Sequence, residues 1–257
     1  MPIIAVATQK GGTAKTTSAW HLGDELARRG LRTLLVDVDP QASLSRALGV
    51  DEPEANLATV IDTTGHRPHD PTAVLKSIDE HLDLLPGDLA LAQVELRLVS
   101  RLMRREYAIA EVLDKVQGRY SWVILDCPPS LSLLTIAALV ASEHVITPTT
   151  LDIVAFRGLG MFLQTLGDIQ DSYPGSARLL GVLATMTAST AHGRDVLTAL
   201  RDRPDLRMFD VTVPRSIKFS EAAFQGKTLN RYAPKHPGAL AYRQLADEVI
   251  SRAQEEA

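Results

Sequence analysis

The stretch Lys10-Gly11-Gly12-Thr13-Ala14-Lys15-Thr16-Thr17 decides how this chain folds, because it joins a strand-like pattern to a helical one. Residues 3–8 before it form a short, β-rich apolar run, and residues 16–29 after it show helical spacing that stops at Gly30. In a strand–turn–helix unit, the backbone N–H groups of the turn and the N-terminal end of the helix dipole attract phosphate. Residues 10–17 therefore predict a binding site for nucleotide phosphates.

The side chains of this loop also fit phosphate chemistry. Lys15 is placed to reach the β- and γ-phosphates, and the Thr16 hydroxyl is placed to coordinate Mg²⁺. The usual pattern G-x-x-x-x-G-K-[ST] is not met, since its two fixed glycines fall on Gln9 and Ala14, and an additional lysine, Lys10, precedes the double glycine. Taken alone, the segment could be a glycine-rich turn before a helix with an incidental lysine.

Short apolar runs alternate with helical patterns along the rest of the chain. The runs expected to form strands are 33–37, 82–85, 122–125, 144–147 and 179–184. The expected helices are 88–105, 106–117, 131–141, 155–170, 192–202 and 238–254. Continuous apolar strands separated by helices predict an α/β fold, a mostly parallel twisted sheet with helices on both faces. We expect one domain over residues 1–257 without an N-terminal helix-turn-helix extension, and a surface excursion at 51–71 with a short helix near 57–61.

Acidic residues stand at the ends of two predicted strands. Asp37 and Asp39 close the run that begins at Thr33, and Asp126 closes the run that begins at Trp122. Ligands of parallel sheets bind at the carboxyl ends of the strands, so these acids are expected beside the phosphate loop. A carboxylate in that position would hold Mg²⁺ or one of its water ligands.

Composition narrows the cellular setting. The single cysteine, Cys127, excludes an internal disulfide and a site built on paired cysteines, and we expect it to be a small buried packing residue. No signal-peptide pattern precedes the first strand, and no apolar run approaches the roughly 18 residues of a membrane span. A cytoplasmic protein without a membrane partner is expected.

Charge is unevenly distributed along the chain. The net charge is −4, yet residues 194–235 contain nine Lys or Arg against five acids. Local sign matters more than the total for a binding face. This stretch is therefore either an ordinary solvated surface or a site for an anionic partner such as DNA.

Together these motifs resemble those of ParA/Soj-type DNA-partition ATPases, which belong to the deviant Walker A branch of P-loop NTPases that also contains MinD. The resemblance rests on the phosphate loop, on residues 36–41 (Val-Asp-Val-Asp-Pro-Gln) and on residues 126–130 (Asp-Cys-Pro-Pro-Ser). It continues through residues 213–222 and 226–227 into the last helix, so it covers nearly the whole chain. It implies a homodimeric, ATP- and Mg²⁺-dependent ATPase that is slow until a ParB-like partner stimulates it.

The resemblance also implies roles for individual residues. Lys10 would reach the nucleotide of a partner subunit and so support a sandwich dimer in the ATP state. Lys15 would stabilise the transferred phosphoryl group, and Asp39 would position the attacking water next to Mg²⁺. Asp126 would act on Mg²⁺ through its water shell, and Asp37 would support the same region. The residues expected to contact the nucleotide are Lys10, Gly11, Gly12, Thr13, Ala14, Lys15, Thr16, Thr17, Pro214 and Ser216; those expected at the metal are Thr16, Asp39 and Asp126.

Partners follow from the same resemblance. Non-specific double-stranded DNA on the nucleoid is the expected surface, because no motif for reading bases is visible. The residues expected to contact DNA are Arg194, Lys218, Lys227 and Arg231. A MinD-like positioning ATPase acting on a membrane or another cargo is the main alternative, but residues 247–256 are acidic and lack bulky apolar anchors. A metabolic amidoligase is a further alternative, for which we see neither extra substrate residues nor a second domain.

One position departs from the family pattern. Most members have a glycine where this chain has Ala14. A methyl group there is tolerated if the backbone angles are helical but not if φ is positive. We nevertheless expect ATP to bind.

Overall fold

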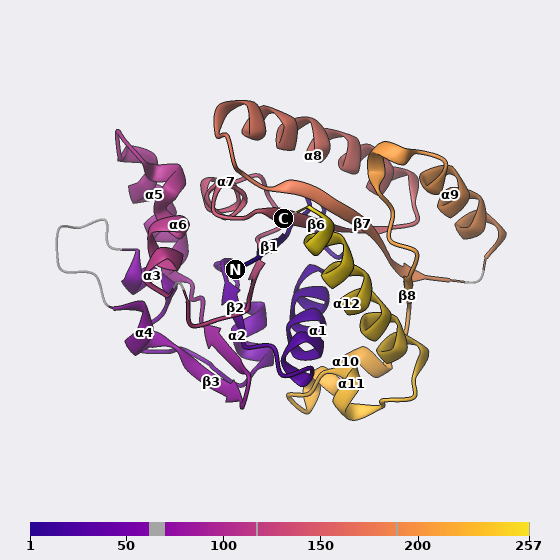
Figure 1. The fold of residues 1–257 in the computed structure, drawn as a ribbon, viewed down its shortest axis with the longest axis horizontal. Coiled ribbons are helices and arrows are strands. Elements are labelled where there is room, and N and C mark those ends of the chain that lie inside the picture. The colour runs from indigo at the N-terminus through magenta and orange to yellow at the C-terminus, as the bar shows by residue number, and fades with distance from the viewer. Residues whose placement is uncertain (62–69, 117, 189, 257) are drawn as a thin grey trace.

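The computed structural model describes residues 1–61, 70–116, 118–188 and 190–256. In this part of the chain the strands form one eight-stranded sheet in the order β3-β4-β2-β5-β1-β6-β7-β8 (Figure 1). Its strands are β1 (Ile3–Val6), β2 (Thr33–Asp37), β3 (Lys76–Asp79), β4 (Leu82–Leu85), β5 (Trp122–Asp126), β6 (His144–Thr150), β7 (Arg178–Thr187) and β8 (Thr212–Pro214). In the described part of the chain, every pair of neighbouring strands is parallel except β3 with β4. The predicted mostly parallel α/β sheet is confirmed.

Helices cover both faces of the sheet (Figure 1). One face packs against α1 (Lys15–Arg28) and α12 (Pro237–Glu255), and the other against α5 (Ala90–Ser100), α6 (Ala108–Leu113), α7 (Leu133–Val140) and α8 (Ile153–Ser172). The remaining helices are α2 (Ser43–Ala47), α3 (Leu57–Val60), α4 (Pro71–Val74), α9 (Ala191–Arg201), α10 (Lys218–Phe224) and α11 (Leu229–Tyr232).

Alternation along the strands explains the two apolar layers. Ile4 and Val6 belong to the layer under α1 and α12, whereas Ala5 belongs to the layer under α7. Both sides of β1 are fully buried, so its sequence reads as a continuous apolar run instead of an alternating one.

Two helix predictions need correction. The helix expected over 88–105 ends at Ser100, and Arg104 takes left-handed backbone angles (φ 58°) that no α-helix can contain. The helix expected over 106–117 is reduced to α6, with 3₁₀ turns at Arg105–Tyr107 and Asp114–Val116. The short helix near 57–61 is confirmed as α3, which begins at the capping residue Asn56. Residues 62–69 of the expected excursion lie outside the described residues.

The strand register brings the predicted loops to one edge of the sheet. Asp126 at the end of β5 lies beside Val6 of β1 and Asp37 of β2. The phosphate loop leaves β1 at this same edge. Among the described residues, no helix is both long and apolar enough to cross a membrane.

Candidate functional site

Left-handed backbone angles form the turn between β1 and α1. Gly12 has a φ of 72° and Ala14 a φ of 63°. Glycine adopts this conformation freely, but in an L-residue the Cβ atom costs about 1–2 kcal/mol. The methyl group of Ala14 therefore stands where it is poorly tolerated, and the helical geometry that would accommodate it is absent at this residue.

Lys15 begins α1 with its side chain largely buried. The residue is 7% exposed, and its Nζ donates to the backbone carbonyl of Lys10 at 3.3 Å. Burial lowers the pKa of Lys15, while the nearby carboxylates of Asp126 and Asp39 act in the opposite direction. A buried ammonium group aimed back at its own loop is suited to neutralising phosphate charge.

Asp126 has the least satisfied carboxylate of the site. The residue is 1% exposed, and neither carboxylate oxygen has a hydrogen-bond partner in the described chain. Burial raises the pKa of Asp126 well above its usual range, and the neighbouring carboxylate of Asp37 adds to this. The nearby Thr16 hydroxyl acts in the opposite direction and lowers the pKa of Asp126, although the two groups do not have the geometry of a hydrogen bond. An orphaned oxygen beside a hydroxyl fits Mg²⁺, which takes few protein ligands and completes its shell with phosphate and water.

Asp37 differs from Asp126 in that its oxygens are satisfied. It accepts hydrogen bonds from the Ser45 backbone N–H (2.8 Å) and hydroxyl (2.7 Å), and from the Asp39 N–H (3.3 Å). Burial raises the pKa of Asp37 to about 6. Asp37 therefore fixes the loop after β2, and with it Asp39, whose Oδ1 accepts from the Gln41 N–H at 2.8 Å. The supporting role of Asp37 toward Mg²⁺ stays a prediction.

Lys10 points away from its own phosphate loop. Its Nζ lies 2.8 Å and 3.0 Å from the two carboxylate oxygens of Asp152, which also caps α8 by accepting from the Ala155 N–H. Partial burial would raise the pKa of Asp152, but hydrogen bonds from Lys10 and Thr150 prevail and hold it at about 2. No sequence pattern links positions 10 and 152, since only the order of β1 and β6 in the sheet brings them together.

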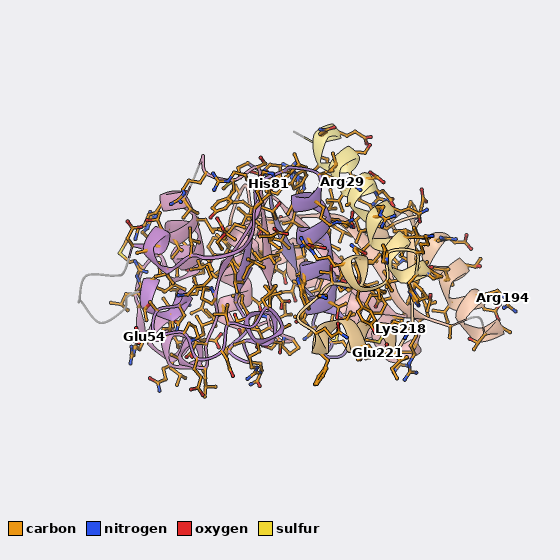
Figure 2. All side chains as sticks on the ribbon, turned by 90° about the horizontal axis from the view of Figure 1, so that it is seen from below. Arg29, Glu54, His81, Arg194, Lys218 and Glu221 are labelled. Atoms are coloured by element: carbon orange, nitrogen blue, oxygen red, sulfur yellow. The ribbon has the colours of Figure 1, made fainter. Side chains whose placement is uncertain are left out.

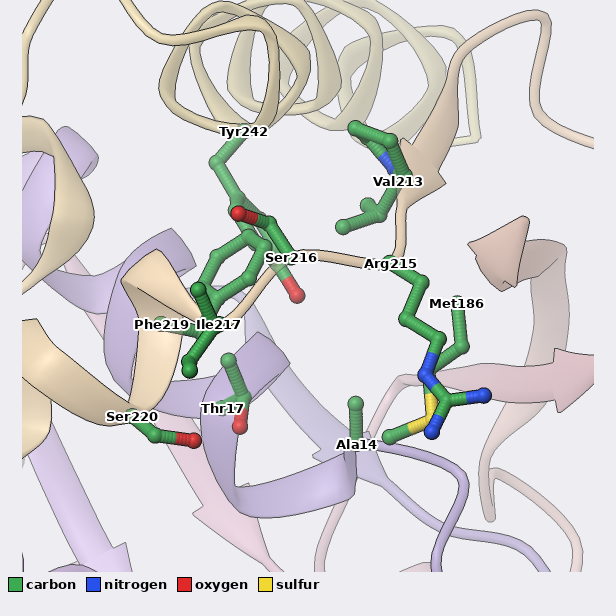
Figure 3. Close-up of a pocket in the computed structure, with 11 residues that line it drawn as sticks. Ala14, Thr17, Met186, Val213, Arg215, Ser216, Ile217, Phe219, Ser220 and Tyr242 are labelled. Carbon is green, nitrogen blue, oxygen red and sulfur yellow. The ribbon is translucent and has the colours of Figure 1, made fainter. Parts of the chain in front are cut away.

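A cavity of about 480 Å³ opens next to the phosphate loop (Figure 3). Pro214 and Ser216, both expected at the nucleotide, line it together with Ala14 and Thr17. Ser216 shares a hydrogen bond with His236 (3.1 Å), which fixes its hydroxyl. Arg215 and Phe219 also line it, and both belong to the segment 213–222 that carries the family resemblance. Met186 of β7 and Tyr242 of α12 line it as well, and the sequence did not identify either of them as a contact.

The basic residues expected at DNA fall into two groups. Lys227 is exposed, as is Arg194, and Lys218 forms an ion pair with Glu221 at 2.6 Å on the protein surface. Figure 2 places Lys218 and Arg194 in the same half of the molecule. Arg231 is different, because it pairs with the buried Asp24 (2.6 Å) and also with Asp79.

Contact between Arg231 and DNA therefore stays a prediction, whereas its ion pairs support a structural role. Two carboxylates compensate its charge, and one of them is buried. The Thr228 hydroxyl donates to the same Asp24 carboxylate at 2.6 Å. Arg231 consequently ties α11 to α1 and contributes little net charge to the surface.

Comparison with known proteins gives a consistent picture. A family model described as an AAA domain matches residues 1–178. The chromosome-partitioning ATPase Soj of Thermus thermophilus is 39% identical over 255 residues, which are 98% of this chain and 96% of that protein. The sporulation initiation inhibitor protein Soj of Bacillus subtilis is 36% identical over 254 residues, 97% and 98% of the two chains.

A solved structure covers the same length. It is described as cobyrinic acid a,c-diamide synthase from Mycobacterium smegmatis with bound ADP and magnesium. It is 37% identical, has a TM-score of 0.86 and covers 100% of this chain and 97% of its own. The names of similar proteins thus point to two kinds of ATP-dependent chemistry, which the site itself must separate.

Proposed function

Because this chain belongs to the ParA/Soj family of P-loop partition ATPases, we propose that it is an ATP-dependent dimerising switch for the partition of a chromosome or plasmid. The observation that carries the proposal is the unpartnered carboxylate of Asp126 beside the phosphate loop. A buried carboxylate without a partner is costly, and a bound cation relieves that cost. Mg²⁺ with ATP is the cation that this loop would supply.

Residues 10–17 hold the phosphates in this proposal, and the cavity around Pro214 and Ser216 takes the nucleoside. Thr16, Asp39 and Asp126 hold Mg²⁺ directly or through water, and the ion supplies positive charge at the β- and γ-phosphates. Lys15 supplies the second positive charge from the same chain. Asp39 orients the attacking water, because its carboxylate is fixed at the end of β2 by the loop that Asp37 anchors.

Hydrolysis in this proposal depends on a second subunit through Lys10. In the chain described here, Lys10 is bound to Asp152. To reach a partner's phosphates it must exchange one carboxylate for a more strongly charged anion. A charge donated across an interface makes catalysis conditional on association, as an arginine finger does.

The proposed DNA interaction is sequence-independent. Two relatives are named for chromosome partitioning, a ParA protein and a Soj ATPase; in line with that role, the protein acts on the nucleoid in this proposal, with a ParB-like partner that stimulates hydrolysis. Lys218, Lys227 and Arg194 would bind phosphates, so affinity falls steeply as salt is raised. ATP then favours the DNA-bound dimer, and hydrolysis releases it.

ATP-dependent amidation is the second candidate, favoured by the name of the similar M. smegmatis structure. Amidation with glutamine as nitrogen donor commonly uses a cysteine thiolate to release ammonia. The only cysteine in this chain, Cys127, is 1% exposed, and burial raises the pKa of its thiol. A thiol in that state is inert. The partition function therefore fits the residues better.

Co-sedimentation separates the proposed functions. With ATP and Mg²⁺, the protein should pellet with long DNA of unrelated sequence but not with anionic liposomes, and ADP should abolish the DNA interaction. Binding to liposomes instead would favour a MinD-like function. ATP turnover that requires a carboxylic acid and glutamine, and that ignores DNA, would replace the proposal with amidation.

A further inference from the structure

The segment made of α5 and the residues at its two ends carries exposed apolar side chains. Of the twelve large apolar residues that are exposed in the described part of the chain, five lie within the 15-residue segment 89–103, with exposures of 57–98%; they are Leu89, Leu96, Val99, Leu102 and Met103. Leu96 and Val99 lie on α5, Leu89 is its N-cap residue, and Leu102 and Met103 follow its end at Ser100. The opposite face of α5 is already buried through Leu91, Val94 and Leu98. A cluster of exposed apolar side chains of this kind marks a surface for a partner. We refer to residues 89, 96, 99, 102 and 103 as the α5 stripe.

A groove of about 690 Å³ continues the α5 stripe toward the nucleotide site. Its lining includes Leu89, Ala90 and Gln93 from the start of α5, and the opposite wall is formed by residues 40–42 and 50–53. Figure 1 shows α5 at the end of the molecule away from α9, which carries Arg194. The groove is therefore separated from that part of the proposed DNA surface.

The wall of the groove is connected to the proposed water-positioning carboxylate. Gln41 donates its backbone N–H to Asp39 Oδ1 at 2.8 Å, and Ala42 donates its N–H to the Asp39 carbonyl at 2.8 Å. Ala42 has a φ of 50°, an unfavourable conformation for an alanine. A strained segment held by Asp39 is one that a bound partner can shift. Occupation of the groove would thereby move Asp39.

Charge indicates what kind of segment fits. Asp51, Glu52 and Asp88 line the groove against one cation, Arg46, whose guanidinium already donates to the Gln41 carbonyl. At the far end of the α5 stripe the local charge is positive instead, since Arg101 and Arg104 share the single carboxylate of Glu111. The complementary segment is therefore apolar along α5 and positively charged at the groove.

We propose that the α5 stripe and the adjoining groove bind a helical segment of the stimulating partner, one with an apolar face and Lys or Arg at the end that enters the groove. This inference rests on the proposed function for its link to ATP hydrolysis. The apolar face supplies the affinity, and the basic end displaces the loop that holds Asp39. Partner binding and stimulated hydrolysis then share one surface.

The test uses the ParB-like protein encoded with this chain as the probe and the full-length chain with ATP and Mg²⁺. Leu96→Asp should weaken binding of the probe at least about tenfold, as for a central interface residue. Met161→Asp, at another exposed apolar site, on α8, should leave binding within about twofold. Asp51→Lys should weaken binding and reduce its dependence on salt, because it reverses a charge that faces the basic end of the segment. Unstimulated ATPase activity should stay unchanged in all three variants.

Two readouts keep this inference separate from the proposed function. A probe that binds wild type, binds Leu96→Asp more weakly and yet does not stimulate the ATPase would support the docking site. That result would contradict the part of the proposed function in which the partner stimulates hydrolysis. Equal binding of wild type and Leu96→Asp, or no binding of the probe to wild type, would overturn the docking site. So would loss of the ATP-dependent dimer in Leu96→Asp, because the α5 stripe would then be covered by a second copy of this chain.

Discussion

Two regions of this molecule differ in whether their charged side chains are buried and whether they are paired. At the phosphate-loop edge of the sheet, Asp126 and Lys15 are buried, and the Asp126 carboxylate has no hydrogen-bond partner in the described residues. Around α10 and α11, Lys218 and Arg231 are more accessible, yet each is already paired with a carboxylate of the same chain. Burial without pairing is costly, so it marks the edge where a ligand must complete the charges. An ion pair at the surface, by contrast, can stabilise the fold without taking part in ligand binding.

Lys10 lies between these extremes. Its side chain is about one-third exposed and pairs with Asp152, which is itself more accessible. An exposed ion pair of this kind contributes about 0–1 kcal/mol. It can therefore be exchanged for another anion at little cost.

The largest expected effect tests Lys10. Lys10→Gln should lower partner-stimulated ATP hydrolysis about 10³-fold, the loss typical when a charge donated across an interface is removed. Phosphate release measures it. Lys76→Gln, at an exposed lysine of β3, is the matched control. Similar rates in both variants would show that Lys10 does not act at the phosphates.

Asp126→Asn should separate activity from stability. Loss of a group that acts on Mg²⁺ through its waters typically reduces activity about 10- to 100-fold. Removal of a buried, unpaired carboxylate should at the same time raise the melting temperature of the nucleotide-free protein. Calorimetry and phosphate release on one preparation measure both quantities. A variant that melts below wild type would argue that Asp126 is satisfied in the free protein.

Lys227→Ala and Arg231→Ala should differ in kind. Lys227→Ala should weaken DNA binding. It should also reduce the slope of log affinity against log salt concentration by the amount expected for about one lost phosphate contact. Arg231→Ala should leave DNA affinity within about twofold but lower the free energy of unfolding by about 2 kcal/mol, since Asp24 keeps only its hydrogen bond from Thr228. Fluorescence anisotropy and urea unfolding separate them. If Arg231→Ala weakened DNA binding as much as Lys227→Ala at equal stability, Arg231 would return to the DNA surface.

The smallest expected effect concerns Ala14. Ala14→Gly should raise the free energy of unfolding by about 1 kcal/mol, because glycine accepts a φ of 63° without the penalty of a Cβ atom. Nucleotide affinity should stay equal or increase. Urea unfolding with and without ATP measures both. A destabilised glycine variant would mean that the entropy of the unfolded chain outweighs the relief of strain.

Sequence patterns predicted the parts of the molecule whose signals are local. Residues 10–17 and Asp39 follow strands, and Asp126 ends one. A parallel sheet therefore brings them to one edge, whatever the order of its strands. Residues gathered from distant elements could not be predicted, because Asp152, Met186 and Tyr242 reach the site only through strand order and helix packing. The predicted C-terminal end of the helix over 88–105 was wrong for a related reason. Apolar residues continue through Leu102 and Met103, but the backbone is already extended at Arg101, directly after Ser100.

The backbone at Ala14 shows a different limit. Its residue type identified a departure from the usual loop, but only the structure shows that φ is positive. The role of Arg231 was similarly hidden. A cation in a basic stretch looks like a site for an anion until the buried Asp24, more than 200 residues away, is placed beside it.

The mass of the protein in solution tests the central claim most directly. With Mg²⁺ and a non-hydrolysable ATP analogue, sedimentation velocity should give twice the monomer mass of 27.9 kDa. With ADP it should give the monomer, and Lys10→Gln should stay monomeric with either nucleotide. A wild-type chain that remained monomeric with the ATP analogue, or that was dimeric with ADP as well, would contradict the account.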